Sequence, residues 1–280
     1  MKNKFNYIVP IFNKEDVLPK TLEGIEKCTS SQSKIILVVD GCTDSSESIV
    51  DNFIKNSSHP TAKLVLPNVH MLLSVNAGIE KVTSGFSVIM QDDIVLQDVH
   101  TEEKIVELYQ REGDNLGVIS FRYGANLRPT SFLQTLRVNK SVEWQEKNVY
   151  KKFKSYFNQM IETFDVIQSP DDNAEYPKAE YETYYNRMCA INGPNVIPWN
   201  LLRKIGKLDE NIAPYGYDDP EYCLRSLKAG FKNGLFAIKY LSEEGWSGSS
   251  RSPEFKKNAQ RIITKSRIYV YDKHKNYFNK

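Results

Sequence analysis

The sequence of 280 residues lacks several features that would assign it to a common class of protein. No apolar run approaches the roughly 20 residues of a membrane-spanning helix, and the first residues contain no apolar signal-peptide core. Charge of one sign is also missing, because 37 basic residues are balanced by 35 acidic ones, which argues against binding to nucleic acid. We expect a globular, cytoplasmic protein that does not bind nucleic acid.

Common cysteine and glycine motifs are absent too. The four cysteines form no C-x-x-C pair that would signal a zinc site or a redox dithiol, so we expect reduced thiols. The first predicted strand is not followed by G-x-G-x-x-G, and G-x-x-x-x-G-K-[ST] occurs nowhere. These absences exclude the usual dinucleotide-binding loop and the P-loop. The cysteines are Cys28, Cys42, Cys189 and Cys223.

Apolar strand-like runs alternate with amphipathic helical patterns over the first hundred residues. After the first run, Leu18, Leu22 and Ile25 fall on one face of a predicted helix. Four successive β-α units predict an α/β fold with a mostly parallel, Rossmann-like central sheet flanked by helices. The predicted strands are residues 5–11, 34–39, 63–66 and 86–90, and residues 49–54 and 72–81 mark further helices.

Acidic residues stand at three places where a predicted strand ends or a predicted helix begins. Asp40 follows the second predicted strand, and Asp92 and Asp93 follow the fourth. Ligands of open parallel sheets bind beyond the carboxyl ends of the strands, so we expect these carboxylates to be neighbours. A third acidic pair, Asp218 and Asp219, precedes a predicted helix.

The second half of the chain is less regular. Residues 122–187 mix aromatic and charged residues without a clear period. In residues 256–280 basic and apolar side chains alternate, and we expect a helix packed on the rest of the protein, with contact to an anionic membrane surface as the alternative. Other predicted elements are a helix at 102–110, a strand at 116–121, a helix at 199–205, and a helix with Pro220 in its first position that ends at Gly230.

Five short motifs occur in a recognisable order. They are Val9-Pro10-Ile11-Phe12-Asn13, Asp40-Gly41-Cys42-Thr43-Asp44, Asn76-Ala77-Gly78, Gln91-Asp92-Asp93 and Asp218-Asp219-Pro220-Glu221. In this order they resemble the motifs of the family-two glycosyltransferases of GT-A fold, over about residues 4–245. The second motif has cysteine where the family has serine.

The resemblance implies a fold and an activity. The fold is a GT-A domain with a smaller acceptor-side subdomain. The activity is inverting transfer of a sugar from a nucleoside diphosphate sugar, with a UDP-sugar favoured, to a hydroxyl of a glycan or lipid-linked acceptor in polysaccharide biosynthesis. Mn²⁺ or Mg²⁺ is the implied cofactor. We expect a donor-binding half at 1–98, an acceptor-binding and catalytic half at 99–245, and a lid with a basic helical extension at 246–280.

On the donor side, the resemblance gives roles to individual residues. Asp93 is the expected direct metal ligand, and Asp92 is expected to orient sugar or ribose hydroxyls, with support of the metal ligand as the alternative. Asp40 is expected to hold the nucleobase, with an ordinary turn residue before Gly41 as the alternative. The other expected donor-binding residues are Pro10, Asn13, Asn76, Gly78 and Arg251.

On the acceptor side, Asp219 is the candidate general base, because inversion needs a base on the face opposite the leaving group. The alternative is that Asp219 only caps a helix beginning at Pro220. Asp218 is expected to shape the acceptor loop, and Glu221 to bind an acceptor hydroxyl. For Arg225, an ion pair with Asp218 or Glu221 is the alternative to a role in the site.

Two departures from the family pattern affect the predicted metal site. Gln91 stands where the family has the first acid of Asp-x-Asp, and the stretch at 242–247 has no histidine where many relatives carry one. Either Glu243 or Glu244 replaces that ligand, or the metal keeps an extra water. The glycine- and serine-rich residues 245–252 suggest a lid in which Trp246 covers the sugar and acceptor site while Arg251 meets the diphosphate; the alternative is a linker.

Two rival functions remain. A sugar nucleotidyltransferase would share the nucleotide-binding sheet, but no glycine-rich, arginine-bearing loop follows the first strand. A non-catalytic relative that binds carbohydrate or nucleotide sugar is consistent with Gln91 and with the missing histidine. An assay that follows release of nucleoside diphosphate separates an enzyme from a binding protein.

Overall fold

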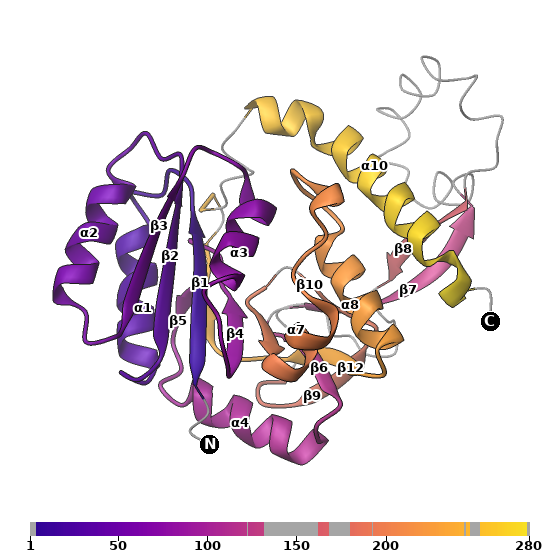
Figure 1. Cartoon of the computed structure of the whole chain (residues 1–280), viewed down its shortest axis with the longest axis horizontal. Coiled ribbons are helices and arrows are strands. Elements are labelled where there is room, and N and C mark those ends of the chain that lie inside the picture. Colours follow the sequence, from indigo (N-terminus) through magenta and orange to yellow (C-terminus); the bar gives the residue numbers. More distant parts are fainter. Residues whose placement is uncertain are drawn as a thin grey trace.

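The computed structural model describes residues 4–121, 123–131, 162–167, 180–191, 193–243, 245–246 and 253–278. An eight-stranded sheet runs through the molecule (Figure 1). Its spatial order is β3 (Thr61–Leu66), β2 (Lys34–Asp40), β1 (Phe5–Ile11), β4 (Phe86–Ile89), β11 (Asn195–Pro198), β6 (Leu116–Ser120), β12 (Lys232–Phe236) and β9 (Tyr184–Arg187).

The first four of these strands are parallel, as the sequence predicts. Strand β11 then runs antiparallel to both of its neighbours, β4 and β6, while β12 is parallel to β6 and β9 is antiparallel to β12. The predicted α/β fold with a mostly parallel sheet is confirmed. The reversal at β11 has a consequence for function, because the start of β11 lies beside the end of β4.

Helices cover both faces of the sheet. The buried side chains of β1 alternate between the faces, with Tyr7 and Val9 in one core and Ile8 in the other. Side chains of α1, α2 and α4 belong to the first core, and side chains of α3, α7, α8 and α10 belong to the second. These helices are α1 (Leu18–Cys28), α2 (Ser46–Asn56), α3 (Met71–Ile79), α4 (Thr101–Glu112), α7 (Trp199–Ile205), α8 (Asp218–Lys228) and α10 (Pro253–Phe278).

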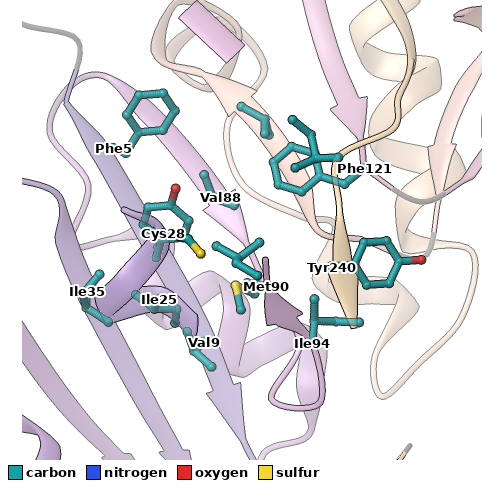
Figure 2. Packing of buried hydrophobic residues seen from close by; sticks show 14 of the residues in the cluster. Phe5, Val9, Ile25, Cys28, Ile35, Val88, Met90, Ile94, Phe121 and Tyr240 are labelled. Carbon is teal, nitrogen blue, oxygen red and sulfur yellow. The ribbon is translucent and has the colours of Figure 1, made fainter. Parts of the chain in front are cut away.

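The first core joins the two halves of the sheet. Figure 2 shows Met90 and Ile94, which follow β4, between the side chains of β1 and α1 on one side and Phe121 and Tyr240 on the other. All of these side chains are at most 9% exposed. The residues that carry Asp92 and Asp93 are therefore anchored on both sides by buried apolar contacts, and the two carboxylates are held in place by the core.

Two smaller sheets complete the fold. A three-stranded sheet contains β10 (Cys189–Ile191), β7 (Tyr123–Ser131) and β8 (Glu162–Ile167), and a two-stranded sheet pairs β13 (Tyr240–Leu241) with β5 (Val95–Leu96). The long helix α10 runs beside α8 (Figure 1), which confirms the predicted packed helix. No helix among the described residues is long and apolar enough to cross a membrane.

Helix α3 lies very close to strand β1 because of one glycine. A Cβ built on Gly78 would lie 2.4 Å from Cγ2 of Ile8, a distance that the packed sheet does not allow. Next to it, Asn76 is buried and exchanges two hydrogen bonds with the backbone of Leu208, one of 2.9 Å and one of 3.0 Å. The Asn-x-Gly motif thus fixes helix α3 between strand β1 and the loop that precedes η2 (Glu210–Ile212).

Replacing Gly78 by alanine tests this packing. Because the added methyl group must displace Ile8 or the helix, we expect Gly78→Ala to lower the free energy of unfolding by about 1–3 kcal/mol. The measurement is denaturant unfolding. Ala77→Ser, at the neighbouring half-exposed position of the same helix, is the control and should cost much less. Equal stability of Gly78→Ala and wild type would show that this contact is not tight.

Candidate functional site

Several of the predicted site residues lie along one edge of the central sheet. In the parallel ladder Ile11 is paired with Val39, so β1 and β2 end together, whereas β4 ends at Ile89 opposite Ile8 and the residues after it continue to the end of β1. Neighbouring strands are about 4.8 Å apart. Asp40 at the end of β2 is therefore separated from the residues after β4 by only two strand spacings, with the loop after β1 between them.

Asp92 is tied to the end of β1. Its Oδ2 accepts a hydrogen bond of 3.0 Å from the backbone N–H of Phe12, and its Oδ1 lies 3.5 Å from Nζ of Lys14. Burial raises the pKa of Asp92 to about 6, although Lys14 and the Phe12 N–H favour the charged form. A raised pKa means that this carboxyl stabilises the fold most when protonated, and that this contribution is lost as the pH rises through about 6.

Sequence reasoning missed Lys14, the most buried charged group at this edge. The residue is 1% exposed, and its backbone N–H donates to Oγ of Ser46 at 2.8 Å. Its ammonium lies 3.5 Å from a carboxylate oxygen of Asp92 and 3.5 Å from one of Asp93, and it donates to the carbonyl of Trp246. Nothing in the sequence indicates that a lysine three residues beyond a strand is buried.

Asp92 and Asp93 are the only predicted donors for a metal ion whose position the structure supports. Two carboxylates suffice in number for Mg²⁺ when substrate phosphates complete the shell. However, the ammonium of Lys14 already bridges one oxygen of each. At 4 Å, a divalent ion and this ammonium would repel by about 8 kcal/mol at an effective dielectric constant of about 20. The residues present therefore do not fit a divalent ion while Lys14 is in place.

The predicted substitute ligands do not change this result. Glu243 is exposed, and Glu244 lies outside the described residues. Within the part of the chain that the structure describes, no group of three histidine, cysteine, aspartate or glutamate side chains is arranged to hold a metal ion. The expected role of Asp93 as a direct metal ligand stays a prediction, and we derive no chemical step from it.

The loop after β2 is bound to the loop after β1. Asn13, which has a positive φ of 49°, accepts a hydrogen bond of 2.8 Å from the backbone N–H of Thr43. Cys42 donates through its Sγ to the carbonyl of Ile11 at 3.3 Å. The cysteine thus provides a donor where the family motif has a serine hydroxyl, and burial raises the pKa of its thiol. The four cysteines are free thiols, as predicted.

Asp40 is 3% exposed and holds the loop that precedes α3. Its Oδ1 accepts a short hydrogen bond of 2.6 Å from the backbone N–H of Val69. Gly41 follows with a φ of +64°, and a Cβ there would lie 2.5 Å from Asn68. Only the second oxygen of Asp40 is left for the expected contact with a nucleobase, so the turn role and the ligand role fall on different atoms.

Asp219 reaches the same edge through Asn195, the second residue that sequence reasoning missed. Its Oδ1 accepts a hydrogen bond of 2.8 Å from Nδ2 of Asn195. Asn195 is 4% exposed and opposes Ile89 in the antiparallel pair of β11 and β4. Asp219 therefore lies next to the end of β4, beyond which Asp92 and Asp93 follow. The only sequence signal was a polar residue at the start of an apolar strand.

The helix that carries Asp219 begins earlier than predicted. Helix α8 starts at Asp218, so Pro220 is its third residue and not its first, and the residue before the helix is Tyr217 in a left-handed conformation with a φ of 64°. The prediction that Asp219 caps this helix is wrong, because Asp219 lies inside its first turn. There the positive end of the helix dipole stabilises a carboxylate. Burial raises the pKa of Asp218.

Glu221 is turned away from this edge and is fully buried. Arg225 donates to both of its oxygens at 3.0 and 2.9 Å, Lys273 of α10 lies 2.7 Å from Oε1, and His274 lies 3.3 Å from the same atom. Burial alone would raise the pKa of Glu221, but these partners hold it below its usual value. Because both oxygens of Glu221 are bound by Arg225 and one also by Lys273 of α10, we assign Glu221 to the docking of α10.

The same helix is bound a second time through Asp209. Lys273 lies 2.6 Å from Oδ2 of Asp209, and the hydroxyl of Tyr269 donates to the same oxygen at 2.7 Å. Against the effect of burial, these two groups hold the pKa of Asp209 well below its usual range. Lys273 thus bridges two carboxylates, which fixes α10 against the loop that leads to Asp218 and Asp219.

The remaining predicted residues have mixed placements. Pro10 is buried inside β1, paired with Val38. Asn76 and Gly78 are in structural contacts of α3. The ring of Trp246 is 8% exposed and lies under Nζ of Lys20, 5.0 Å from it, so it does not project over the edge as a cover for a sugar. Arg251 lies outside the described residues.

Comparison with known proteins supports this arrangement. The family model described as glycosyl transferase family 2 matches residues 7–170, more than half of the chain. The chain belongs to this family. No curated protein sequence matches it significantly.

Solved structures share the fold at low sequence identity. A mannosyltransferase from Pyrobaculum calidifontis, solved with GDP-Man and Mn²⁺, is 13% identical with a TM-score of 0.54, and the match covers 86% of this chain and 58% of that one. S. aureus TarS is 13% identical with a TM-score of 0.55, covering 96% and 39%. The chain spans less than two thirds of either protein. These matches establish the GT-A fold.

The buried charges around Glu221 lead to a stability prediction. Replacement by glutamine leaves Arg225 without its counter-charge and Lys273 with Asp209 alone, so Glu221→Gln should lower the free energy of unfolding by about 3–5 kcal/mol. The control is Glu107→Gln on the exposed face of α4, and denaturant unfolding measures both. A loss as small as that of the control would mean that Glu221 does not anchor α10.

The pH dependence of α10 follows from the same groups. Glu221 and Asp209 both have lowered pKa values, so their contribution is complete above about pH 4 and is lost as the pH falls below it. We expect the amide protons of α10 to lose protection in acid before those of β1 and β2. Hydrogen exchange measured at pH 7 and at pH 3.5 checks this, and equal losses in helix and sheet would contradict it.

Proposed function

We propose that this family-two glycosyltransferase moves a sugar from a nucleoside diphosphate sugar to an acceptor hydroxyl with inversion. The observation that carries the proposal is the hydrogen bond between Asp219 and Asn195, which lies opposite Ile89 at the end of β4. It sets a carboxylate suited to proton transfer beside the edge where Asp40 ends β2 and Asp92 follows β4. A protein that only bound nucleotide sugar would have no use for a base oriented in this way.

The donor is proposed to bind at the carboxyl ends of β1, β2 and β4. The nucleobase lies by Asp40, whose second oxygen accepts an N–H of the base, and a uracil is favoured for this reason. The hydrogen bond between Asn13 and Thr43 closes the floor beneath the nucleoside. Asp92, held by the Phe12 N–H, orients hydroxyls of the ribose or sugar. Residues 1–98 are accordingly the proposed donor half, and residues 99–245 the acceptor and catalytic half.

Asp219 is the proposed general base. As the acceptor oxygen attacks the anomeric carbon, the carboxylate takes the hydroxyl proton, and the bond to the diphosphate breaks on the opposite face of the sugar. The amide of Asn195 donates to one carboxylate oxygen and so fixes the orientation of the base. Asn195 is thus a positioning residue. Asp218 shapes the loop around the base.

The predictions about the metal ion, the class of acceptor and the membrane contact are not part of this proposal. The Mn²⁺ or Mg²⁺ ion expected on Asp93 is not included, because Lys14 fills the space between the two carboxylates. A glycan or lipid-linked acceptor, and contact of α10 with a membrane surface, stay predictions from the sequence. Sedimentation with vesicles that contain acidic lipid is the direct measurement for the second.

An assay of nucleoside diphosphate release tests the proposed function. We expect purified protein to release UDP or GDP from one member of a panel of nucleotide sugars when a hydroxyl acceptor is supplied. Loss of general-base catalysis should lower kcat of Asp219→Asn by about 10²–10⁴-fold, with the Kd for the nucleoside diphosphate unchanged. Thermal shift with the same panel identifies the donor before the assay.

Asp114→Asn is the matched control. This exposed aspartate precedes β6 at the opposite end of the strand from Ser120, which pairs with Asn195, so its loss should leave turnover unchanged. Full turnover in Asp219→Asn would show that another group is the base. Binding of a nucleotide sugar without any turnover in the wild-type protein would favour the non-catalytic alternative.

A further inference from the structure

The ammonium of Lys14 has the surroundings of a bound cation. It has three N–H donors, and it is faced by three oxygens, one each from Asp92, Asp93 and the carbonyl of Trp246. These oxygens come from two separate parts of the chain, the residues after β4 and the segment around Trp246. With 1% exposure and a backbone N–H fixed on Ser46, the side chain is part of the interior and does not swing through solvent.

We propose that Lys14 supplies the positive charge of the donor site and takes the place of a divalent ion. The proposal rests on the proposed function and deepens it by naming the group that faces the leaving diphosphate. Negative charge grows on that diphosphate as the bond to the sugar breaks, and a fixed cation next to it stabilises the transition state. Held between Asp92 and Asp93, the ammonium occupies the position that those carboxylates would give to a metal ion.

The third oxygen around Lys14 is the one that a donor can replace. Asp92 and Asp93 follow β4 and are anchored through Met90 and Ile94 in the first core. The carbonyl of Trp246 is neutral, whereas a phosphate oxygen is anionic and forms a stronger charge-assisted bond with an ammonium. A phosphate oxygen of the donor therefore takes the place of the Trp246 carbonyl, and the two aspartates keep the ammonium in position.

Lys20 provides a matched comparison. This second lysine also touches Trp246, but through the ring and not the carbonyl, with its Nζ 5.0 Å from the ring centroid. It lies in α1 and is exposed. A variant at Lys20 removes one positive charge from the same neighbourhood, and it leaves the pair of Asp92 and Asp93 unchanged.

The first experiment titrates the wild-type protein with three ligands, Mn²⁺, UDP and GDP. Mn²⁺ alone is titrated and followed by the electron paramagnetic resonance of the free ion, and UDP and GDP are titrated by calorimetry in EDTA or in Mn²⁺. We expect no Mn²⁺ binding at the aspartates, and the same nucleotide Kd in both buffers. Mn²⁺ binding that is lost in Asp93→Asn, or nucleotide binding only with Mn²⁺, would overturn the proposal.

The second experiment uses Lys14→Met, which keeps the length of the side chain and removes its charge. Loss of a charge-assisted hydrogen bond should weaken the binding of UDP or GDP in EDTA by about 10- to 100-fold. The emptied position should now accept Mn²⁺, and Mn²⁺ should restore affinity. Lys20→Met is expected to behave as wild type in both measurements. Unchanged nucleotide affinity of folded Lys14→Met in EDTA would overturn the proposal.

Failure of this inference and failure of the proposed function give different results. If the wild-type protein turns over a donor only with Mn²⁺, Lys14 is not the cation and the glycosyltransferase assignment stands. If it binds neither UDP nor GDP and releases no nucleoside diphosphate, the proposed function fails. The Mn²⁺ titrations of wild type and Lys14→Met still decide in that case whether the ammonium excludes a divalent ion from Asp92 and Asp93.

Discussion

The antiparallel pairing of β11 with β4 is the constraint on which the site depends. The first strands of the sheet are parallel, so every one of their carboxyl ends faces the same edge. A further parallel strand would place its last residue, and not its first, at that edge. Because β11 enters in the opposite direction, it brings its first residue, Asn195, to that edge. Through Asn195, helix α8 from the second half of the chain is joined to strand β4 from the first half.

A second constraint is the need to compensate buried carboxylates. Asp92 and Asp93 are paired with Lys14, and Glu221 is paired with Arg225, Lys273 and His274. An uncompensated buried charge is costly, so each pair holds its partners in a fixed arrangement.

Both groups of charges also involve the C-terminal part of the chain. Lys14 binds the carbonyl of Trp246, and Glu221 together with Asp209 binds α10. The residues on either side of 247–252 are thus fixed to two different places. One is the end of β1 in the donor half, and the other is the first turn of α8, which carries Asp219. Charge pairing therefore adds contacts outside the central sheet to the connection that β11 and β4 make within it.

Much of the fold could be predicted from the sequence, because strand and helix patterns are local. The strand at 5–11 and the helix at 199–205 have the predicted bounds, and the motifs place Asp40 and Asp92 at strand ends. Burial of a charged side chain, however, depends on groups far away in sequence. Lys14 is 78 residues from Asp92 and 232 from Trp246, and no local pattern indicates that they meet. The start of α8 was misplaced because a proline suits more than one position in a first turn.

Within one motif, some residues are expected to bind a ligand and others support the fold. The residue type alone does not show which role a residue has. Asn76 uses its amide on the backbone of Leu208, and Gly78 makes room for Ile8. Cys42 and Asn13 link two loops. These residues hold the edge of the sheet in shape, and their expected contacts with the donor stay a prediction. Asp92 differs from them because it is held by Phe12 and Lys14 yet has a pKa of about 6. The effect of burial on this carboxyl outweighs that of its partners and is costly for folding, and such a cost is typical of a residue kept for its chemistry.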